Sequence, residues 1–212
     1  MNRLRDNKFD VIIIGGGITG AGIALDAATR GLKVALVEKN DFASGTSNKS
    51  SKLIHGGLRY LQNLQFKTTF EASREKTLLK QLVPHLITDI EFTIPYWSLK
   101  DRIKYSCGLW LYDLMSFDKL HTHLNRQQTT ERLGCDLNQN GAFVYHDAIT
   151  VDYRLVMHVL KMAQAYGAVI SNYMKVNEIL FNDKQKAIGV KTDRFNIYAD
   201  TVVSCTGAWS KD

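Results

Sequence analysis

The chain begins with two short apolar runs separated by a segment of small residues. Residues 9–14 (FDVIII) and 33–38 (KVALVE) are rich in β-branched side chains, which is typical of strands buried on both faces of a parallel sheet. Between them, residues 18–30 carry Gly and Ala on a predicted helix, and Gly31 supplies a stop signal. This order predicts a β-α-β unit with a right-handed crossover.

The middle of the chain has a helical pattern. Residues 67–82 are helical by composition, and residues 141–145 are typical of a strand. In residues 98–117 the apolar positions recur at helical spacing, at Ile103, Cys107, Trp110, Leu111 and Leu114. We therefore expect a mainly helical insertion after the first β-α-β unit.

The last third of the chain returns to an α/β pattern. Residues 152–166 predict an amphipathic helix whose apolar face holds Leu155, Val159, Met162, Ala163 and Tyr166. Short strands at hairpin spacing are expected at 176–181, 187–191 and 195–198, and a buried strand at 201–205. The fold class is therefore α/β, a Rossmann-like domain in two segments, 1–64 and 151–212, split by an insertion over 65–150.

Composition limits the partners. The 212 residues, 45% of them hydrophobic, fit one large domain or two small ones. A net charge of +6 favours anionic partners such as phosphates, phospholipid head groups or nucleic acid. We find no aromatic and basic platform in the sequence, so we expect no nucleic-acid partner. No apolar run reaches the roughly 20 residues of a membrane-spanning helix, so any membrane contact should be peripheral.

Cysteine and histidine give little evidence for a metal. The three cysteines form no CxxC pair, which favours a reducing compartment, and Cys205 is interpreted as a small core residue. His121 and His123 form an HxH pair that could ligate a metal, but exposed loop histidines are the favoured interpretation. We expect no metal.

A phosphate-binding motif follows the first predicted strand. Residues 15–20 (GGGITG) contain GxGxxG, in which Gly15 permits a tight turn, Gly17 lets the backbone reach a pyrophosphate and Gly20 packs helix on strand. The helix N-terminus then offers free amides to an anion. The candidate cofactor residues here are Gly15, Gly16, Gly17, Ile18, Thr19 and Gly20. A glycine-rich turn without a ligand is the alternative.

Glu38 ends the second predicted strand at about the 20-residue interval expected of a ribose-binding carboxylate. Its charge would repel a 2′-phosphate, which argues against NADP. Lys39 is assigned to the same cofactor site. These residues leave NAD and FAD open.

The segment DVIIIGGGITGAGIALDAATRGLKVALVEKNDFASGTSNKSSKLIHGGLRYL, together with VDYRL at 151–155 and CTGAW at 205–209, resembles the FAD-dependent aerobic glycerol-3-phosphate dehydrogenase family. The resemblance covers nearly the whole chain. Residues 45–61 are specific to that family, whereas 15–38 are shared with many flavoproteins. The resemblance implies an FAD-binding domain of the glutathione-reductase and amino-acid-oxidase type, with FAD as cofactor.

The resemblance also implies roles for individual residues. Those expected near the FAD pyrophosphate and flavin are Thr46, Ser47, Ser51, Lys52, Leu53 and His55, with Gly56 and Gly57 leaving room for the flat ring. Val176 would reach the adenine, and Thr206, Gly207 and Trp209 would form a later FAD contact. Arg59 and Tyr60 match the family's substrate-site pair. A guanidinium holds a phosphate through two parallel hydrogen bonds, which lysine does not reproduce.

The implied reaction is oxidation of sn-glycerol 3-phosphate to dihydroxyacetone phosphate, with hydride transfer to flavin N5 and electrons passed to quinone. The family's catalytic base and further phosphate-binding residues lie beyond the aligned stretch, so the chain is expected to be truncated C-terminally and inactive alone. The alternatives are an oxidase that forms peroxide and a non-catalytic FAD-binding remnant.

Membrane association is a further expectation. Aromatic and basic residues mix along one predicted helix, at Trp97, Lys100, Arg102, Lys104, Trp110 and Tyr112, a pattern that suits a membrane interface. On sequence alone, a helix that packs in the core with a basic outer face is favoured. The resemblance implies a cytoplasmic protein held peripherally at the inner face of the cytoplasmic membrane, and a homodimer is a further assembly to test.

Overall fold

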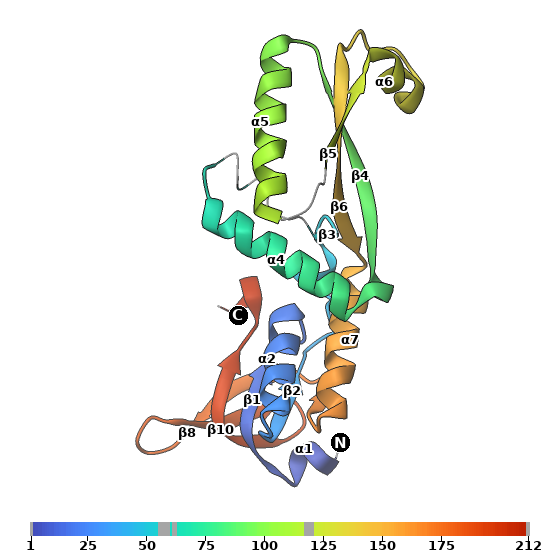
Figure 1. Ribbon diagram of the computed structural model, residues 1–212. Helices are drawn as coiled ribbons and strands as arrows, with labels where there is room; N and C mark the ends of the chain where they lie inside the picture. The colour runs from blue at the N-terminus through green and yellow to red at the C-terminus, as the bar shows by residue number, and fades with distance from the viewer. Residues whose placement is uncertain (1, 55–59, 61–62, 117–120, 211–212) are drawn as a thin grey trace. The chain divides into compact units, whose positions relative to one another are not determined.

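The computed structural model describes residues 2–54, 60, 63–116 and 121–210 (Figure 1). The chain forms two compact units, Met1–Ser51 with Val151–Asp212 and Lys52–Thr150. The sequence analysis placed the first boundary after residue 64, whereas residues 52–64 fall in the second unit. The reason is that β3 (Leu53–Ile54) pairs with β6 (Gly141–Thr150).

The first unit is built on a six-stranded sheet with the order β7-β2-β1-β10-β9-β8. Its first four strands run parallel and the last two pairings are antiparallel. The bounds are β1 (Lys8–Ile14), β2 (Val34–Val37), β7 (Val169–Ser171), β8 (Val176–Phe181), β9 (Ala187–Thr192) and β10 (Asn196–Ser204). The expected β-α-β unit is therefore present, with β1 and β2 as neighbouring parallel strands and β1 and β10 at the centre of the sheet.

β10 is one strand where the sequence analysis expected two. Its start, at Asn196, Ile197 and Tyr198, pairs antiparallel with β9. From Tyr198 onward it pairs parallel with β1. The expected break at 199–200 is absent because the strand changes partners there without leaving the sheet.

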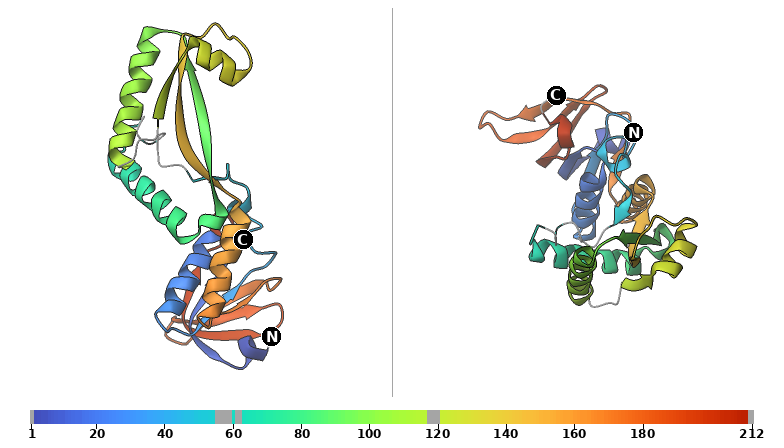
Figure 2. Two further views of the ribbon diagram at one scale, coloured as in Figure 1. Left: turned by 45° about the vertical axis from the view of Figure 1, so that its right-hand side comes forward. Right: turned by 90° about the horizontal axis from the view of Figure 1, so that it is seen from above.

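Two helices pack together on the sheet of the first unit, α2 (Ile18–Thr29) and α7 (Asp152–Ala165) (Figure 2). The small side chains of α2 allow this close approach, and α7 buries Val156, Leu160 and Ala163 in the shared core. The apolar face expected for α7 is wrong in part, since Met162 and Tyr166 are exposed. The buried side of α7 is centred on Val156, Leu160 and Ala163, so Met162 and Tyr166 lie at the margin of the apolar face. A short helix, α1 (Asn2–Arg5), precedes β1.

The second unit combines long helices with an antiparallel sheet. The helices are α4 (Phe66–Leu82), α5 (Leu99–Ser116) and α6 (Arg126–Leu133). The sheet has the order β3-β6-β4, with β5 (His121–Asn125) also paired to β6. The expectation of a mainly helical insertion holds for the two longest elements but missed β4 (Ile87–Tyr96) and most of β6. α4 and α5 lie on one side of this sheet (Figures 1 and 2).

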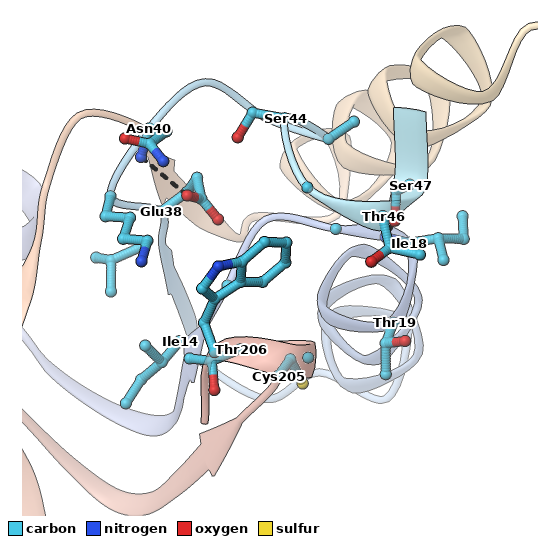
Figure 3. Close-up of a pocket in the computed structure, with 18 of the residues that line it drawn as sticks. Ile14, Ile18, Thr19, Glu38, Asn40, Ser44, Thr46, Ser47, Cys205 and Thr206 are labelled. Carbon is cyan, nitrogen blue, oxygen red and sulfur yellow. Dashed lines mark hydrogen bonds between the residues drawn. The ribbon is translucent and has the colours of Figure 1, made fainter. Parts of the chain in front are cut away.

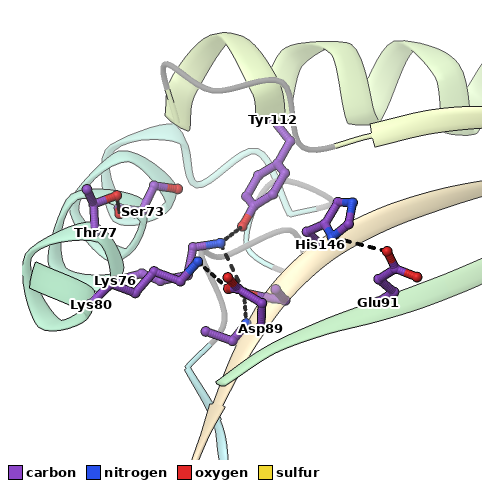
Figure 4. Close-up of polar contacts among 10 residues, drawn as sticks. Ser73, Lys76, Thr77, Lys80, Asp89, Glu91, Tyr112 and His146 are labelled. Atoms are coloured by element: carbon purple, nitrogen blue, oxygen red, sulfur yellow. Dashed lines mark hydrogen bonds and ion pairs between the residues drawn. The ribbon is translucent and has the colours of Figure 1, made fainter. Parts of the chain in front are cut away.

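α4 presents polar side chains to the interior of the second unit. Its buried residues are Thr69, Ser73 and Lys76. The Lys76 ammonium donates to the Asp147 carboxylate at 3.0 Å and to the Tyr112 hydroxyl at 3.1 Å, and all three side chains are buried (Figure 4). A buried charge is tolerated when it is paired and hydrogen-bonded in this way.

The HxH histidines do not lie in a loop, contrary to the sequence interpretation. Both are on β5. His121 Nδ1 lies 2.7 Å from Asp113 Oδ2, and His123 Nε2 lies 2.8 Å from the Tyr96 hydroxyl. Burial, and then the nearby charge of Arg102, lower the pKa of His123. In the part of the chain that the structure describes, the His, Cys, Asp and Glu side chains form no group of three suited to a metal.

Among the described residues, no helix has both the length and the apolar character needed to cross a bilayer.

Candidate cofactor site

The turn after β1 has the backbone geometry that its glycines predict. Gly15 has φ +115°, and a Cβ placed on it would lie 2.5 Å from the carbonyl oxygen of Cys205, the residue that follows β10. A Cβ on Gly20 would lie 2.0 Å from the carbonyl oxygen of Gly15. Both positions therefore need glycine, one for the turn and one for the close approach of α2 to it.

The N-terminus of α2 opens into the site. Gly17 is its N-cap and supplies no side-chain cap. Instead, the backbone N–H of Ile18 donates to Ser47 Oγ at 2.9 Å. Ser47 belongs to a short 3₁₀ helix, η1 (Thr46–Asn48), in the polar run after β2. The arrangement places a serine hydroxyl beside the positive end of a helix, which is a favourable environment for a phosphate.

Glu38 is fixed at the end of β2 by backbone amides. Its Oε2 accepts from the N–H of Gly16 at 2.8 Å, and its Oε1 accepts from the N–H of Asn40 at 2.8 Å. A carboxylate oxygen has more than one lone pair, so each can also accept from a ligand hydroxyl. This geometry suits the ribose role that the sequence predicts for Glu38.

These groups line a cavity of about 650 Å³ in the first unit (Figure 3). Figure 3 shows Glu38 and Asn40 at one end and Ile18, Thr46 and Ser47 at the other. Cavities of roughly 300–1,000 Å³ are typical of cofactor sites. The predicted cofactor residues that line it are Gly15, Gly17, Ile18, Thr19, Glu38, Lys39, Thr46, Ser47, Val176, Thr206, Gly207 and Trp209.

The cavity is electropositive. Lys39, Lys49 and Lys175 are among its lining residues, and Glu38 is the one acidic side chain among the described lining residues. Lys39 Nζ lies 6.0 Å from the centre of the Trp209 ring. Three ammonium groups and a helix N-terminus around one carboxylate favour a ligand with a diphosphate and a sugar hydroxyl.

Cys205 also lines the cavity. Burial raises the pKa of its thiol, so the neutral form is favoured near neutral pH. A neutral, half-buried thiol is unreactive, which supports the interpretation of Cys205 as a small packing residue.

Several predicted residues lie elsewhere. Gly16 and Gly20 shape the turn without lining the cavity, and Ser51 is exposed outside it. Lys52, Leu53 and Tyr60 belong to the second unit, so their cofactor and substrate roles stay predictions. His55, Gly56, Gly57 and Arg59 lie outside the described residues.

The sequence analysis missed several lining residues. They are Ile14, Val37, Asn40, Ala43, Ser44, Gly45, Lys49, Met174, Lys175 and Cys205. Ser44, Gly45 and Lys49 are close in sequence to Thr46 and Ser47, which the resemblance assigns to the cofactor, so their position in the chain carried a usable signal. Met174 and Lys175 precede β8 and are brought in by the backbone bond from the N–H of Met174 to the carbonyl oxygen of Glu38, 2.8 Å. That contact joins distant segments, and no local pattern predicts it.

The fold and this site define an FAD-dependent oxidoreductase. Residues 10–212 match the family described as "FAD dependent oxidoreductase", and the chain belongs to that family. The cavity fits the cofactor through its helix N-terminus, its lysines and the anchored carboxylate. The expectation of FAD as cofactor is confirmed.

The resemblance to one branch of this family is also confirmed. The chain is 39% identical, over 97% of its length, to the aerobic glycerol-3-phosphate dehydrogenase of Staphylococcus saprophyticus. It is 38% identical, over 99% of its length, to the enzyme of the same name from Staphylococcus aureus. The chain spans 39% and 40% of the length of these two relatives.

Solved structures agree with the fold. The glycerol-3-phosphate dehydrogenase from Bacillus halodurans, complexed with FAD, has a TM-score of 0.75 and 34% identity over 98% of this chain and 36% of its own. The L-proline dehydrogenase from P. horikoshii also has a TM-score of 0.75, at 20% identity, over 97% of this chain and 54% of its own. The second similarity is one of fold alone.

Proposed function

We propose that this chain is the FAD-binding portion of an enzyme that oxidises sn-glycerol 3-phosphate to dihydroxyacetone phosphate and passes the electrons to quinone. The observation that carries the proposal is the anchored Glu38 opposite the open N-terminus of α2, in a chain 39% identical to an aerobic glycerol-3-phosphate dehydrogenase. The names of the relatives supply the substrate.

The described residues would hold the two halves of the nucleotide. The amides at the start of α2, with the Ser47 hydroxyl, would bind the diphosphate, because their partial positive charge opposes it. Glu38 would accept hydrogen bonds from the adenosine ribose. Lys39 and Lys175 would add charge at the rim of the cavity. A bound FAD would supply the hydride acceptor of the proposed reaction.

Arg59 and Tyr60 are proposed to bind the substrate phosphate and position its secondary alcohol. This rests on their place in the family-specific segment 45–61. A guanidinium donates two parallel, charge-assisted hydrogen bonds to a phosphate. The proton of the C2 hydroxyl would go to a base, which the sequence analysis places C-terminal to the aligned stretch.

The proposal is tested by reduction of bound flavin without oxygen. The full-length protein should be purified yellow and mixed anaerobically with glycerol 3-phosphate. Loss of the visible flavin absorbance with glycerol 3-phosphate, but not with glycerol, supports the proposal. A yellow full-length protein that glycerol 3-phosphate leaves oxidised would overturn the substrate assignment.

The electron acceptor is tested separately. After reduction, the flavin is exposed to a soluble quinone or to oxygen. Fast reoxidation by quinone, with little peroxide, is expected of the dehydrogenase. Stoichiometric peroxide with oxygen would instead identify an oxidase.

A further inference from the structure

The loop that carries Thr46 and Ser47 is held in place mainly by hydrogen bonds. Residues 44–50 are exposed or half-buried, so burial of apolar side chains contributes little to their position. Just before them, the buried Ala43 donates its backbone N–H to the carbonyl oxygen of Gly16 at 3.0 Å. The backbone bonds inside η1 are local, so they fix the shape of η1 but not its place beside α2. A second anchor is needed after η1.

The Ser50 hydroxyl provides that second anchor. It donates to Asp152 Oδ2 at 2.7 Å, across 102 positions of sequence. Asp152 is the first residue of α7, and η1 also packs against this helix within the first unit. A hydrogen bond to a carboxylate is charge-assisted and is stronger than one between neutral groups. The end of the loop is therefore tied to α7.

The helix that holds the loop is packed against the helix that presents the amides. One side of α7 is buried in the core that it shares with α2. The Ile18 N–H at the start of α2 donates to Ser47 Oγ at 2.9 Å (Figure 3), and a Cβ placed on Gly17 would lie 3.0 Å from the same oxygen. These contacts form a closed ring, from α2 through Ser47 and Ser50 to Asp152, and back through α7 to α2.

We propose that Asp152 is a positioning residue for the cofactor site: through Ser50, it holds the Ser47 hydroxyl in place for the FAD diphosphate. Neither Ser50 nor Asp152 lines the cavity, so both act through the loop rather than on the ligand. A loop that is already in place loses less conformational freedom when the ligand binds, which increases affinity. This inference rests on the proposed role of α2 and Ser47 in binding the diphosphate.

Asp152 also stabilises α7 directly. A carboxylate in the first turn of a helix interacts favourably with the helix dipole. That effect concerns the stability of the helix and predicts no change in the FAD affinity of the folded protein. The positioning role predicts a lower FAD affinity, and it predicts the same loss when Ser50 is changed instead.

Titration of FAD into the full-length apoprotein, followed by flavin fluorescence, tests the proposal. Ser50→Ala and Asp152→Ala should each raise the Kd of FAD about fivefold, which corresponds to about 1 kcal/mol. The double variant should raise the Kd by about the same factor, because the two changes break one hydrogen bond. An unchanged Kd in Ser50→Ala, or a double variant with the product of the two single effects, would overturn the proposal.

Asp152→Asn separates the hydrogen bond from the charge at the start of α7. The amide oxygen of asparagine still accepts from Ser50, so the Kd should stay within about twofold of the wild-type value. Urea unfolding of the apoproteins, measured in parallel, should show a loss of stability in both Asp152 variants. A Kd that rises in step with the loss of stability across all the variants would indicate a purely structural role and would contradict the proposal.

Ser98→Ala is the matched control. Ser98 Oγ donates to Asp101 Oδ2 at 2.6 Å near the start of α5, so the change breaks the same kind of bond in the second unit. Ser98 does not line the cavity, and its replacement should leave the Kd of FAD unchanged. A loss equal to that of Ser50→Ala would count against a specific role of Asp152. Circular dichroism verifies that each variant is folded.

Ser47→Ala tests the role on which the inference rests. It should raise the Kd at least as much as Ser50→Ala does, because it removes the hydroxyl that the loop positions. An unchanged Kd in Ser47→Ala would overturn the proposed role of Ser47, and the positioning role of Asp152 with it. A weaker affinity in Ser47→Ala, with none in Ser50→Ala, would overturn the positioning role alone.

Discussion

The Glu38 carboxylate accepts the backbone N–H of Gly16 at 2.8 Å, across 22 positions of sequence. The contact joins the end of β2 to the turn after β1. It therefore fixes Glu38 and the glycine-rich turn, which both belong to the cofactor site, relative to each other.

Replacing Glu38 by Gln should weaken FAD binding about 10- to 100-fold, because a hydrogen bond to a charged group contributes about 1.5–3 kcal/mol. Flavin fluorescence quenching on titration into apoprotein measures the affinity. Asp26→Asn is the matched control, because the Asp26 side chain forms an exposed ion pair with Arg30 on α2 and does not line the cavity. An unchanged FAD affinity in Glu38→Gln would remove Glu38 from the site.

Gly15 and Gly22 offer a comparison of two glycines close in sequence. Gly15→Ala forces a side chain into φ +115° and against the Cys205 carbonyl, and should cost about 1–3 kcal/mol from backbone strain alone. Gly22 lies within α2, and a Cβ placed on it would meet nothing within 4 Å outside its own helix, so Gly22→Ala should stabilise by about 0.5–1 kcal/mol. Urea unfolding of both variants measures the two effects. The same sign in both would contradict the geometry of the turn.

Arg59→Ala in the full-length protein should raise the KM for glycerol 3-phosphate steeply and leave bound flavin intact. Lysine should restore little, because it lacks the forked geometry for a phosphate. Steady-state kinetics with a quinone acceptor, alongside the flavin content, separates the two roles. Unchanged kinetics would exclude Arg59 from the substrate site.

The stability of the second unit should depend on Tyr145 at high pH. Burial, and then the negative charge of Asp147, raise the pKa of Tyr145 to about 12. A free tyrosine ionises near pH 10, so the unfolded chain loses this proton first. The contribution is full below about pH 10 and is lost as the pH rises through about 12. The unfolding free energy should fall more over this window in the wild type than in Tyr145→Phe, as urea titrations at several pH values would show.

The first half of the cofactor site could be predicted from the sequence because its signals are local. The strand, the GxGxxG turn and the small-residue helix are contiguous, and Gly15 needs its glycine for reasons of backbone geometry alone. The sequence of β4 also has the alternation typical of a strand. Its apolar residues at 90, 92, 94 and 96 are separated by Glu91, Thr93 and Pro95. Pro95 weakens this signal, because proline has no backbone N–H to donate and is uncommon within strands.

The rest of the fold and of the site depends on which surfaces of the helices and sheets pack together. α5 has more apolar positions than one face holds, so the periodicity of its sequence does not determine which side is buried. Tyr112 and Leu109 are buried because α4 and the sheet lie on that side. Likewise, Lys175 lies at the cavity because the neighbouring Met174 N–H donates to the Glu38 carbonyl oxygen. This contact joins distant segments, so sequence spacing does not predict it.

The inward lysine of α4 limits how the insertion can be assembled. A slip of α4 by one turn that placed Ser73 opposite Asp147 would leave the buried Asp147 carboxylate without its ammonium partner. Such a mispaired arrangement carries an uncompensated charge, at a cost of about 3–5 kcal/mol. The hydrogen-bonded group of Lys76, Asp147 and Tyr112 therefore disfavours this alternative position of α4. An all-leucine face would not discriminate between the two positions.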